Sequence, residues 1–265
     1  MSSESKSSNM IEVTLASKWD ASKENPTDYF LSEKLDGMRC VWDGTELWTR
    51  NGKKIHAPRS LVDALPHDFT LDGELFLGRG KFQDLMSIVN SGSTHPSWSR
   101  VKYAVFDSPT APGDFLTRLA AIHAALVPSN CTYILEHTVC TGSAHAFAEL
   151  DAVIARGGEG IMLRNPKAPY ESGRSKNLLK FKRTLDAEAR IIGIENGKGK
   201  NAGRMGALKC LMIPEGKEFK IGTGFTDAQR DRHPPIGSIV TYKYQELTKA
   251  GLPRFPVFDR VRPQE

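Results

Sequence analysis

The apolar residues of this chain fall into short runs separated by turn residues. Apolar residues that cluster or alternate predict strands at 28–32, 69–76 and 101–107. Apolar residues that recur every three or four positions predict helices at 82–89, 115–126 and 144–155. The part of the chain before residue 183 is therefore expected to mix strands with helices.

Turn and capping residues mark several of the element ends. Strands at 39–42 and 45–49 flank Asp43 and Gly44, which predicts a two-residue hairpin turn because both residue types tolerate a positive φ. Asp114 stands before the helix at 115–126 and is its expected N-cap, since a carboxylate there can accept a hydrogen bond from the first turn.

The pattern changes after Arg183, where helical spacing gives way to short strands. Strands are predicted at 189–194, 206–213, 217–221, 238–247 and 255–261. Five short strands in this length suggest a barrel of the OB type, a fold that commonly binds nucleic acid. We expect a disordered tail at 1–10, domains at 11–183 and 184–265, and a hinge near 182–186.

Composition places the chain among ordinary globular proteins. Its 265 residues are 39% hydrophobic and 25% charged, which argues against a disordered or fibrous protein. The net charge of +5 and the pI near 9.0 favour a polyanionic partner only modestly, and a merely basic soluble protein fits them equally well. The histidines form no cluster with metal-ligand spacing.

The cysteines and the N-terminus bear on the cellular compartment. The four cysteines lie far apart without a Cys-x-x-Cys pair, which favours reduced structural thiols over a zinc site or a disulfide framework. Residues 1–10 are polar, and no apolar run is long enough to span a membrane. We expect a cytoplasmic protein without membrane association, while a mature periplasmic form that has lost a leader stays open.

One lysine stands out by its position and neighbours. Lys34 follows a predicted strand, and the next strand begins a few residues later. Asp36, Gly37 and Arg39 follow it, and the glycine would let a ligand approach the backbone. These are the parts of a nucleophile above a phosphate site, although Lys-x-Asp-Gly also occurs in ordinary solvated hairpins.

The surroundings of this lysine resemble a known superfamily. Lys-x-Asp-Gly-x-Arg at 34–39 resembles the nucleotidyltransferase signature of DNA ligases, RNA ligases and mRNA capping enzymes. The segment Glu-Gly-Ile-Met-Leu-Arg at 159–164 has the form that ATP-dependent DNA ligases share. Further motifs follow in the family order at 49–52, 69–76, 101–107 and 178–183 and, less clearly, at 253–262.

Within that superfamily the chain resembles the minimal ATP-dependent DNA ligases of the small bacterial and viral type, from Ser32 to Arg262. The resemblance implies an α+β fold, in which an ATP-grasp-like nucleotidyltransferase (adenylation) domain of antiparallel sheets and helices precedes a C-terminal OB-fold β-barrel. It implies sealing of 5′-phosphate/3′-hydroxyl nicks in duplex DNA through a covalent lysyl-AMP and an adenylated DNA, in DNA repair, replication or recombination.

The resemblance also assigns roles to motif residues. Lys34 would be the nucleophile that carries AMP, and Glu74 would fix the ribose, whereas Asp72 is expected to be a structural carboxylate satisfied by its neighbours. Phe106 would stack on the adenine, although a core Phe in a strand fits the same pattern. The other nucleotide-binding candidates, whose basic members would neutralise phosphate charge, are Glu33, Arg39, Arg50, Glu159, Lys180 and Lys182.

The implied ligands are ATP, Mg²⁺, which Mn²⁺ could replace, and nicked double-stranded DNA. Glu159 would anchor the metal, directly or through water, and Asp36 would either hold metal-bound water or order the loop. Candidates to orient the pyrophosphate, or to contact DNA phosphates instead, are Arg260 and Arg262. DNA-binding candidates in a glycine-rich loop are Lys198, Lys200 and Arg204. A monomer without an obligate protein partner is expected.

Three alternatives remain open at the level of sequence. A GTP-dependent capping enzyme shares the lysine chemistry and the OB domain, and an RNA ligase would fit the first domain. A binding protein that kept a degenerate nucleotidyltransferase fold could have lost Lys34, Glu74 or Glu159, and the chain retains all three. A preference for ATP over GTP would separate the ligase from the capping enzyme.

Overall fold

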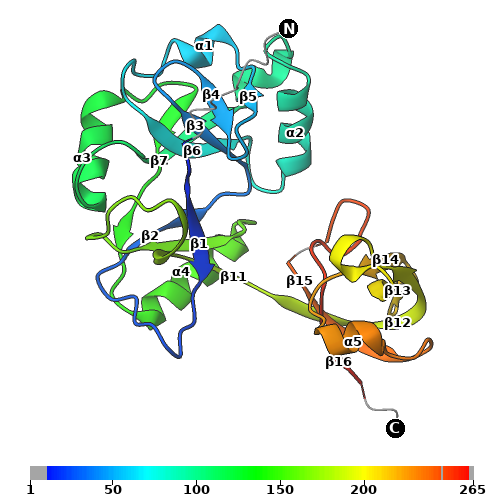
Figure 1. Ribbon diagram of the computed structural model, residues 1–265. Coiled ribbons are helices and arrows are strands. Elements are labelled where there is room, and N and C mark those ends of the chain that lie inside the picture. The colour runs from blue at the N-terminus through cyan, green and yellow to red at the C-terminus, as the bar shows by residue number, and fades with distance from the viewer. Residues whose placement is uncertain (1–10, 246, 263–265) are drawn as a thin grey trace, which may run out of the picture. The chain divides into compact units, whose positions relative to one another are not determined.

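The computed structural model describes residues 11–245 and 247–262, so the tail expected at 1–10 lies outside the described residues. The chain separates into two compact units at the bond between Lys182 and Arg183 (Figure 1). The first unit mixes sheets with helices, and the second is built mainly from short strands.

One sheet of the first unit has six strands in the order β5-β4-β3-β6-β7-β8. Every neighbouring pair is antiparallel except β7 and β8, which run parallel, so the sheet is mixed at this edge. The strand bounds are β3 Met38–Trp42, β4 Leu47–Thr49, β5 Lys54–Ile55, β6 Leu71–Phe76, β7 Lys102–Asp107 and β8 Thr132–Ile134.

The other sheet of this unit has five strands in the order β1-β11-β10-β2-β9. Here β1 and β11 run parallel and the remaining pairs are antiparallel. The pairs of both sheets are thus antiparallel, as the resemblance implied, apart from one parallel pair at the edge of each sheet. The strand bounds are β1 Thr14–Lys18, β2 Phe30–Lys34, β9 Thr138–Val139, β10 Gly160–Arg164 and β11 Gly173–Lys182.

Helices pack on both sheets and complete their cores. Leu85 of α2 is buried in the core of the six-stranded sheet, and Val153 of α4 is buried in the core of the five-stranded sheet. Helix α3 begins at its expected N-cap, where the Asp114 carboxylate accepts a hydrogen bond from Thr117 N. The helical bounds are α1 Arg59–Val62, α2 Phe82–Asn90, η1 Pro96–Arg100, α3 Phe115–Ala125 and α4 Ser143–Ala155.

The turn between β3 and β4 lies one residue later than predicted. Asp43 N donates to Glu46 O at 3.1 Å, so the two central residues are Gly44 and Thr45 rather than Asp43 and Gly44. The Asp43 carboxylate accepts hydrogen bonds from the backbone N–H groups of Thr45 and Glu46, each at 2.8 Å. Asp43 thus caps the turn from outside through its side chain, and the predicted position was wrong.

The second unit is a single antiparallel sheet whose edges meet. Its strand order is β14-β13-β12-β15-β16. Thr223, just after β14, forms a bridge with Val257 of β16, and Phe258 N donates to Thr223 O at 2.9 Å. This contact between the two edge strands closes the sheet into the expected barrel. The bounds are β12 Leu185–Asn196, η2 Gly199–Asn201, β13 Met205–Met212, β14 Glu218–Ile221, α5 Asp227–Asp231, β15 Ile239–Tyr244 and β16 Val257–Val261.

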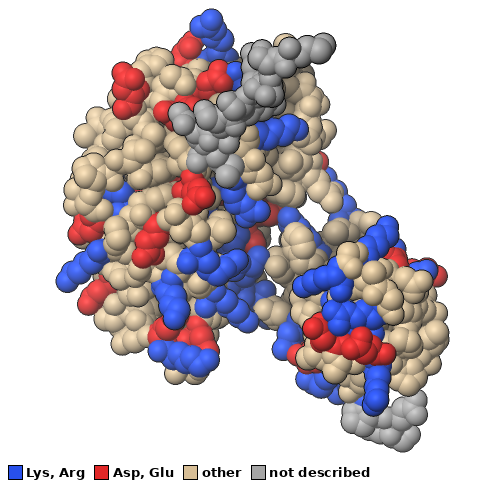
Figure 2. Space-filling view, viewed as in Figure 1, with Lys and Arg blue, Asp and Glu red and all other residues tan. Residues whose placement is uncertain are grey.

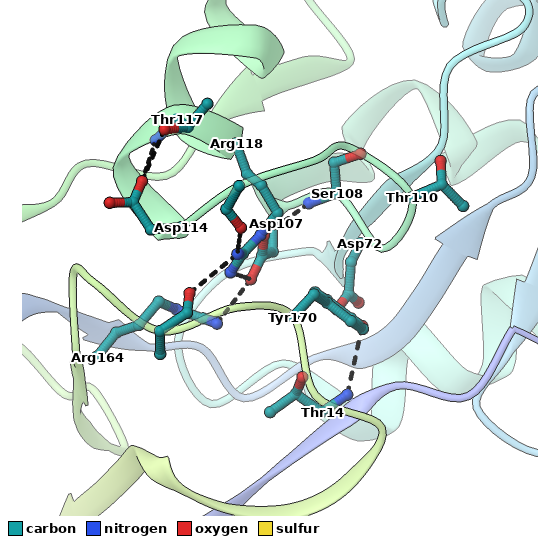
Figure 3. A network of polar contacts seen from close by, with 12 residues as sticks. Thr14, Asp72, Asp107, Ser108, Thr110, Asp114, Thr117, Arg118, Arg164 and Tyr170 are labelled. Atoms are coloured by element: carbon teal, nitrogen blue, oxygen red, sulfur yellow. Dashed lines mark hydrogen bonds and ion pairs between the residues drawn. The ribbon is translucent and has the colours of Figure 1, made fainter.

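A buried carboxylate joins the two sheets of the first unit (Figure 3). Asp107, at the end of β7, is fully buried and accepts from Arg118 of α3 at 2.8 and 3.2 Å. Arg164, at the end of β10, donates to the same carboxylate at 2.7 Å. Arg118 also donates to the backbone carbonyls of Gly113 and Ala168. Since each charge has several partners, the desolvation cost of burying this cluster is offset.

We expect Arg118→Met to destabilise the protein by about 3 kcal/mol or more, because it leaves the buried Asp107 and two backbone carbonyls without their main donor. The free energy of unfolding from urea titration measures this loss. Arg156→Met is the matched control, since Arg156 makes one exposed ion pair with Glu149 and should lose less than about 1 kcal/mol. Equal losses in the two variants would contradict the role of the cluster.

Candidate active site

A cavity of about 260 Å³ in the first unit is lined by residues of both its sheets. Strand β2 reaches it from the five-stranded sheet, and β3, β6 and β7 reach it from the six-stranded sheet. The cavity therefore collects residues that are far apart in the sequence. The predicted site residues on its lining are Glu33, Lys34, Arg39, Arg50, Glu74, Phe106 and Lys180.

The register of β2, β10 and β11 arranges one face of the sheet in three rows. Strand β10 lies between the other two, and alternate residues of each strand share a face. The first row is Lys34, Gly160 and Lys182, the second is Ser32, Met162 and Lys180, and the third is Phe30, Arg164 and Leu178. All three residues of the second row line the cavity, as do Lys34, Arg164 and Leu178.

A carboxylate links the two lysines of the first row. Lys34 Nζ donates to Glu159 Oε2 at 2.5 Å, and Lys182 Nζ donates to Oε1 at 2.5 Å. Glu159 directly precedes β10, which brings its side chain between the ends of β2 and β11. Burial acts to raise the pKa of Glu159, but the two ammonium groups outweigh burial and hold it below its usual value.

Two motif glycines allow backbones to pack closely. A Cβ on Gly160 would lie 2.4 Å from Phe181 O, so a side chain there would push β10 away from β11. A Cβ on Gly37 would lie 2.1 Å from Leu75 O of β6. Gly37 was expected to let a ligand approach the backbone, but strand β6 fills this space instead.

Arg39 is held at the cavity by a buried carboxylate. Its guanidinium donates to both oxygens of Asp72, at 2.5 and 2.6 Å, and lies 4.8 Å from the centre of the Phe106 ring. Tyr170 OH donates to Asp72 at 2.6 Å and accepts from Thr14 N at 3.3 Å. Figure 3 shows Tyr170 between Thr14 and Asp72. Asp72 is thus the satisfied structural carboxylate that was expected.

Glu74 is a carboxylate on the cavity lining, whereas Asp72 is fully buried in the same strand. Glu74 pairs in register with Arg39 across β3 and β6. Burial raises its pKa to about 7, while the charges of Arg39 and Lys34 oppose the shift. Its protonation state therefore changes near neutral pH, and it can either donate or accept a hydrogen bond there.

The remaining nucleotide-binding candidates of the first half of the chain differ in their partners. The Glu33 carboxylate takes two hydrogen bonds from Arg79, at 2.8 and 2.7 Å. Arg50 lines the cavity from the turn after β4. Asp36 lies on the loop between β2 and β3 and is a described residue that does not line the cavity.

Basic side chains gather where β11 lies. Figure 2 shows Lys and Arg over β1 and β11 of the first unit. Partial burial lowers the pKa of Lys180, and the charges of Lys182 and Lys34 lower it further. Arg174, at the other end of β11, lines the cavity and donates to Ala16 O at 2.7 Å. A concentration of positive charge beside a cavity suits a polyphosphate ligand.

Several basic residues of the second unit that were predicted to bind DNA or pyrophosphate form ion pairs within that unit. Arg204 forms ion pairs with Asp227 and Asp231 of α5, at 3.1 and 3.8 Å. Lys198 and Lys200 are exposed on the β12–β13 connection around η2. In the last strand region, Arg260 pairs with Asp259 at 2.8 Å and Arg262 pairs with Glu188 at 2.9 Å.

Comparison with known proteins identifies the family. Residues 10–182 match the model of the ATP dependent DNA ligase domain, which is more than half of the chain. The chain belongs to the ATP-dependent DNA ligases. Residues 196–262 of the ligase match the DNA ligase OB-like domain, in agreement with the closed sheet of the second unit.

Individual relatives support this assignment over nearly the full length. A DNA ligase of Haemophilus influenzae is 40% identical over 236 residues, which cover 88% of this chain and 87% of that protein. A structure from a study of Lig E DNA ligases superposes with a TM-score of 0.87 at 41% identity, covering 95% of this chain and 99% of that one. The Chlorella virus DNA ligase-adenylate gives a TM-score of 0.55 at 28% identity, covering 97% and 99%.

The fold, the reaction class and the use of ATP that the sequence predicted are thereby confirmed. The ligase is an enzyme that forms phosphodiester bonds, with a nucleotidyltransferase unit followed by an OB-fold unit. ATP and a divalent metal ion are general requirements of the family, and DNA repair and replication are its typical tasks. A non-catalytic binding protein is not supported.

The side chains around the cavity provide few ligands for a metal ion. Among the described residues, no group of three or more His, Cys, Asp or Glu side chains could hold a metal by itself, and all four cysteines carry free thiols. Glu159 nevertheless offers one half-buried carboxylate beside the cavity. A Mg²⁺ ion held by one carboxylate, water and substrate phosphates fits this arrangement.

No helix among the described residues has the length and apolar character needed to cross a membrane.

Several cavity residues were not among the sequence-based candidates. Ser32 and Met162 could have been found, because they lie two positions from Lys34 and Gly160 on the same strand faces. Arg164 belongs to the 159–164 motif and carried no predicted role. His137 and Arg174 lie outside the residues given a role, and only the folded chain brings them to the cavity.

The raised pKa of Glu74 predicts a pH-dependent stability. Between pH 4.5 and 7 the unfolded carboxyl loses its proton while the folded one keeps it, so the folded state loses stability as the pH rises through this window. We expect Glu74→Gln to remove about 3 kcal/mol of this dependence between pH 4 and pH 8, measured by urea unfolding. Glu136→Gln, an exposed control, should keep the wild-type dependence. Parallel pH profiles for wild type and Glu74→Gln would contradict the assignment.

Proposed function

We propose that this ligase seals nicks between a 5′-phosphate and a 3′-hydroxyl in duplex DNA, with Lys34 as its nucleophile. The observation that carries the proposal is the position of Lys34 at the end of β2, on the lining of the cavity and 2.5 Å from Glu159. No other lysine of the described residues except Lys180 lines this cavity. Lys180 lies in the second row, two residues before Lys182 on β11.

In the first step the Lys34 amine attacks the α-phosphorus of ATP. A P–N bond forms, the bond to the bridging oxygen breaks, and pyrophosphate leaves. The attacking amine must be unprotonated, and Glu159 Oε2 is the group placed to hold its proton. The product is Lys34 linked to AMP.

The next two steps move AMP onto DNA and then release it. The 5′-phosphate of the nick displaces Lys34 from AMP, and the 3′-hydroxyl then displaces AMP to form the phosphodiester. Glu74 fixes the ribose, and Phe106 stacks on the base. Charge that develops on the phosphates is neutralised by basic residues of both sheets, namely Arg39, Arg50, Lys180 and Lys182.

Mg²⁺, with Mn²⁺ as a substitute, is the metal that best fits this donor set. When bound, it supplies positive charge to the phosphate oxygens. Glu159 would anchor it, and Asp36 would act through water from the neighbouring loop.

The OB-fold unit is proposed to hold the DNA. Its basic residues would contact backbone phosphates, which gives affinity without reading sequence. The proposed domains are 11–183 for adenylation and 184–265 for DNA binding, in a monomeric cytoplasmic enzyme without an obligate protein partner. The residues involved are Lys198, Lys200 and Arg204 for DNA, and Arg260 and Arg262 for DNA or pyrophosphate.

We expect Lys34→Ala to abolish both the covalent protein–AMP band and nick sealing, because Lys34 is the cavity lysine whose amine is bonded to Glu159. A 5′-labelled nicked duplex with Mg²⁺ and ATP, GTP or NAD⁺ measures sealing, and a denaturing gel measures the adduct. Lys102→Ala, an exposed lysine on β7, should behave as wild type. An adduct in Lys34→Ala, or sealing that prefers GTP or NAD⁺, would refute the mechanism.

We expect Glu159→Gln to raise the Mg²⁺ concentration for half-maximal adenylation by at least about tenfold, because a neutral amide binds the ion weakly. Initial rates of adduct formation over a Mg²⁺ titration measure this shift. Glu136→Gln is the matched control and should leave the titration unchanged. A wild-type Mg²⁺ dependence in Glu159→Gln would show that Glu159 does not anchor the metal.

A further inference from the structure

His137 lies on the cavity at the end remote from the reactive lysine. It directly precedes β9, which pairs with the start of β2 through Phe30 and Val139. Its ring centre is 6.5 Å from that of Phe30 and 5.1 Å from that of Phe115. His137 therefore stands beside the third row of the sheet, and neither the predicted motifs nor the proposed chemistry uses it.

The contacts of His137 fix which ring nitrogen carries the proton. Nδ1 lies 2.8 Å from Leu135 O, and a carbonyl oxygen can only accept, so Nδ1 is the donor. Burial, together with the nearby charge of Arg164, lowers the pKa of His137 to about 4 and keeps the ring neutral at physiological pH. Nε2 then carries a lone pair and is an acceptor.

The spacing of the rows relates His137 to a nucleotide held at Lys34. Lys34 lies four positions after Phe30 on β2, which corresponds to about 13 Å along the strand. A nucleotide bonded to Lys34 through its α-phosphorus and laid along the rows places its ribose over the second row. Its base then extends toward the third row, and both Phe106 and His137 belong to the lining of the same cavity.

The arginine side chains near this end of the cavity already have a carboxylate partner. Arg164 Nη1 donates to Asp107 at 2.7 Å, and its guanidinium lies 4.7 Å from the centre of the Phe115 ring. The other donor to Asp107 is Arg118, which is almost fully buried. His137 Nε2 is thus an uncharged acceptor of a residue on the cavity lining, beside groups whose charges are already paired.

We propose that His137 selects adenine over guanine, because its Nε2 accepts a hydrogen bond from the exocyclic 6-amino group of adenine. Guanine carries an oxygen at this position, so two acceptors would face each other and both would be left unpaired. This inference rests on the proposed function and deepens it, since it names the residue of the same site that sets the choice of nucleotide.

The test compares three nucleotides in the adenylation step. They are ATP, GTP and purine riboside triphosphate, which lacks the 6-amino group but keeps the rest of the base. For wild type we expect kcat/KM to be roughly tenfold lower with purine riboside triphosphate than with ATP, the factor that one hydrogen bond is worth. The loss should fall in KM, because this contact is made equally in the ground state and the transition state.

The variants His137→Ala and His137→Gln complete the test. In His137→Ala, ATP and purine riboside triphosphate should react equally, and the preference for ATP over GTP should fall roughly tenfold or more. In His137→Gln the amide can both donate and accept, so GTP should gain relative to ATP. His67→Ala, an exposed histidine of the same unit, should keep the wild-type ratios.

Each outcome separates the inference from the proposed function. Equal use of ATP and purine riboside triphosphate by wild type overturns the role of His137, whether or not the variants fold. A wild-type ratio that persists in His137→Ala also overturns it and gives base selection to other groups. Failure of wild type to form any covalent nucleotide would instead refute the proposed function itself.

Discussion

The position of β10 between β2 and β11 is the constraint on which the site depends. Its antiparallel register with both neighbours brings Lys34 and Lys182 to the two sides of Gly160, although 147 residues separate them in the sequence. Gly160 is required because any side chain would collide with the backbone of β11. Glu159 then projects from the start of β10 to both lysines. The two residues Glu159 and Gly160 are thus needed together, one for charge and one for packing.

The buried carboxylates of the first unit divide into two kinds. Asp72 and Asp107 are fully buried, and each is saturated by an arginine and a further donor, so each acts as a fixed anchor. Glu74 and Glu159 are in the same region but have fewer or exchangeable partners. The anchors position Arg39 and Arg164 at the cavity, and the other two carboxylates remain able to change their partners during a reaction.

The sequence predicted those features that depend on short spans of chain. The position of Lys34 at a strand end, the cap at Asp114 and the five strands of the second unit follow from local periodicity and from turn or capping residues. The turn at Asp43 was misplaced because a side chain, rather than the backbone pattern, caps it. The pair of Glu33 with Arg79 and the placement of His137 depend on packing between sheets, which no local pattern encodes.

The connection between the two units is very short. Only Arg183 and Thr184 lie between Lys182, the last residue of β11, and Leu185, the first residue of β12. Two extended residues span at most about 7 Å, so a change in the backbone torsions of the linker acts within two residues of Lys182. The joint and one wall of the catalytic site therefore share the same few peptide bonds. Lys182, the last residue before the joint, is also the residue that pairs with Glu159.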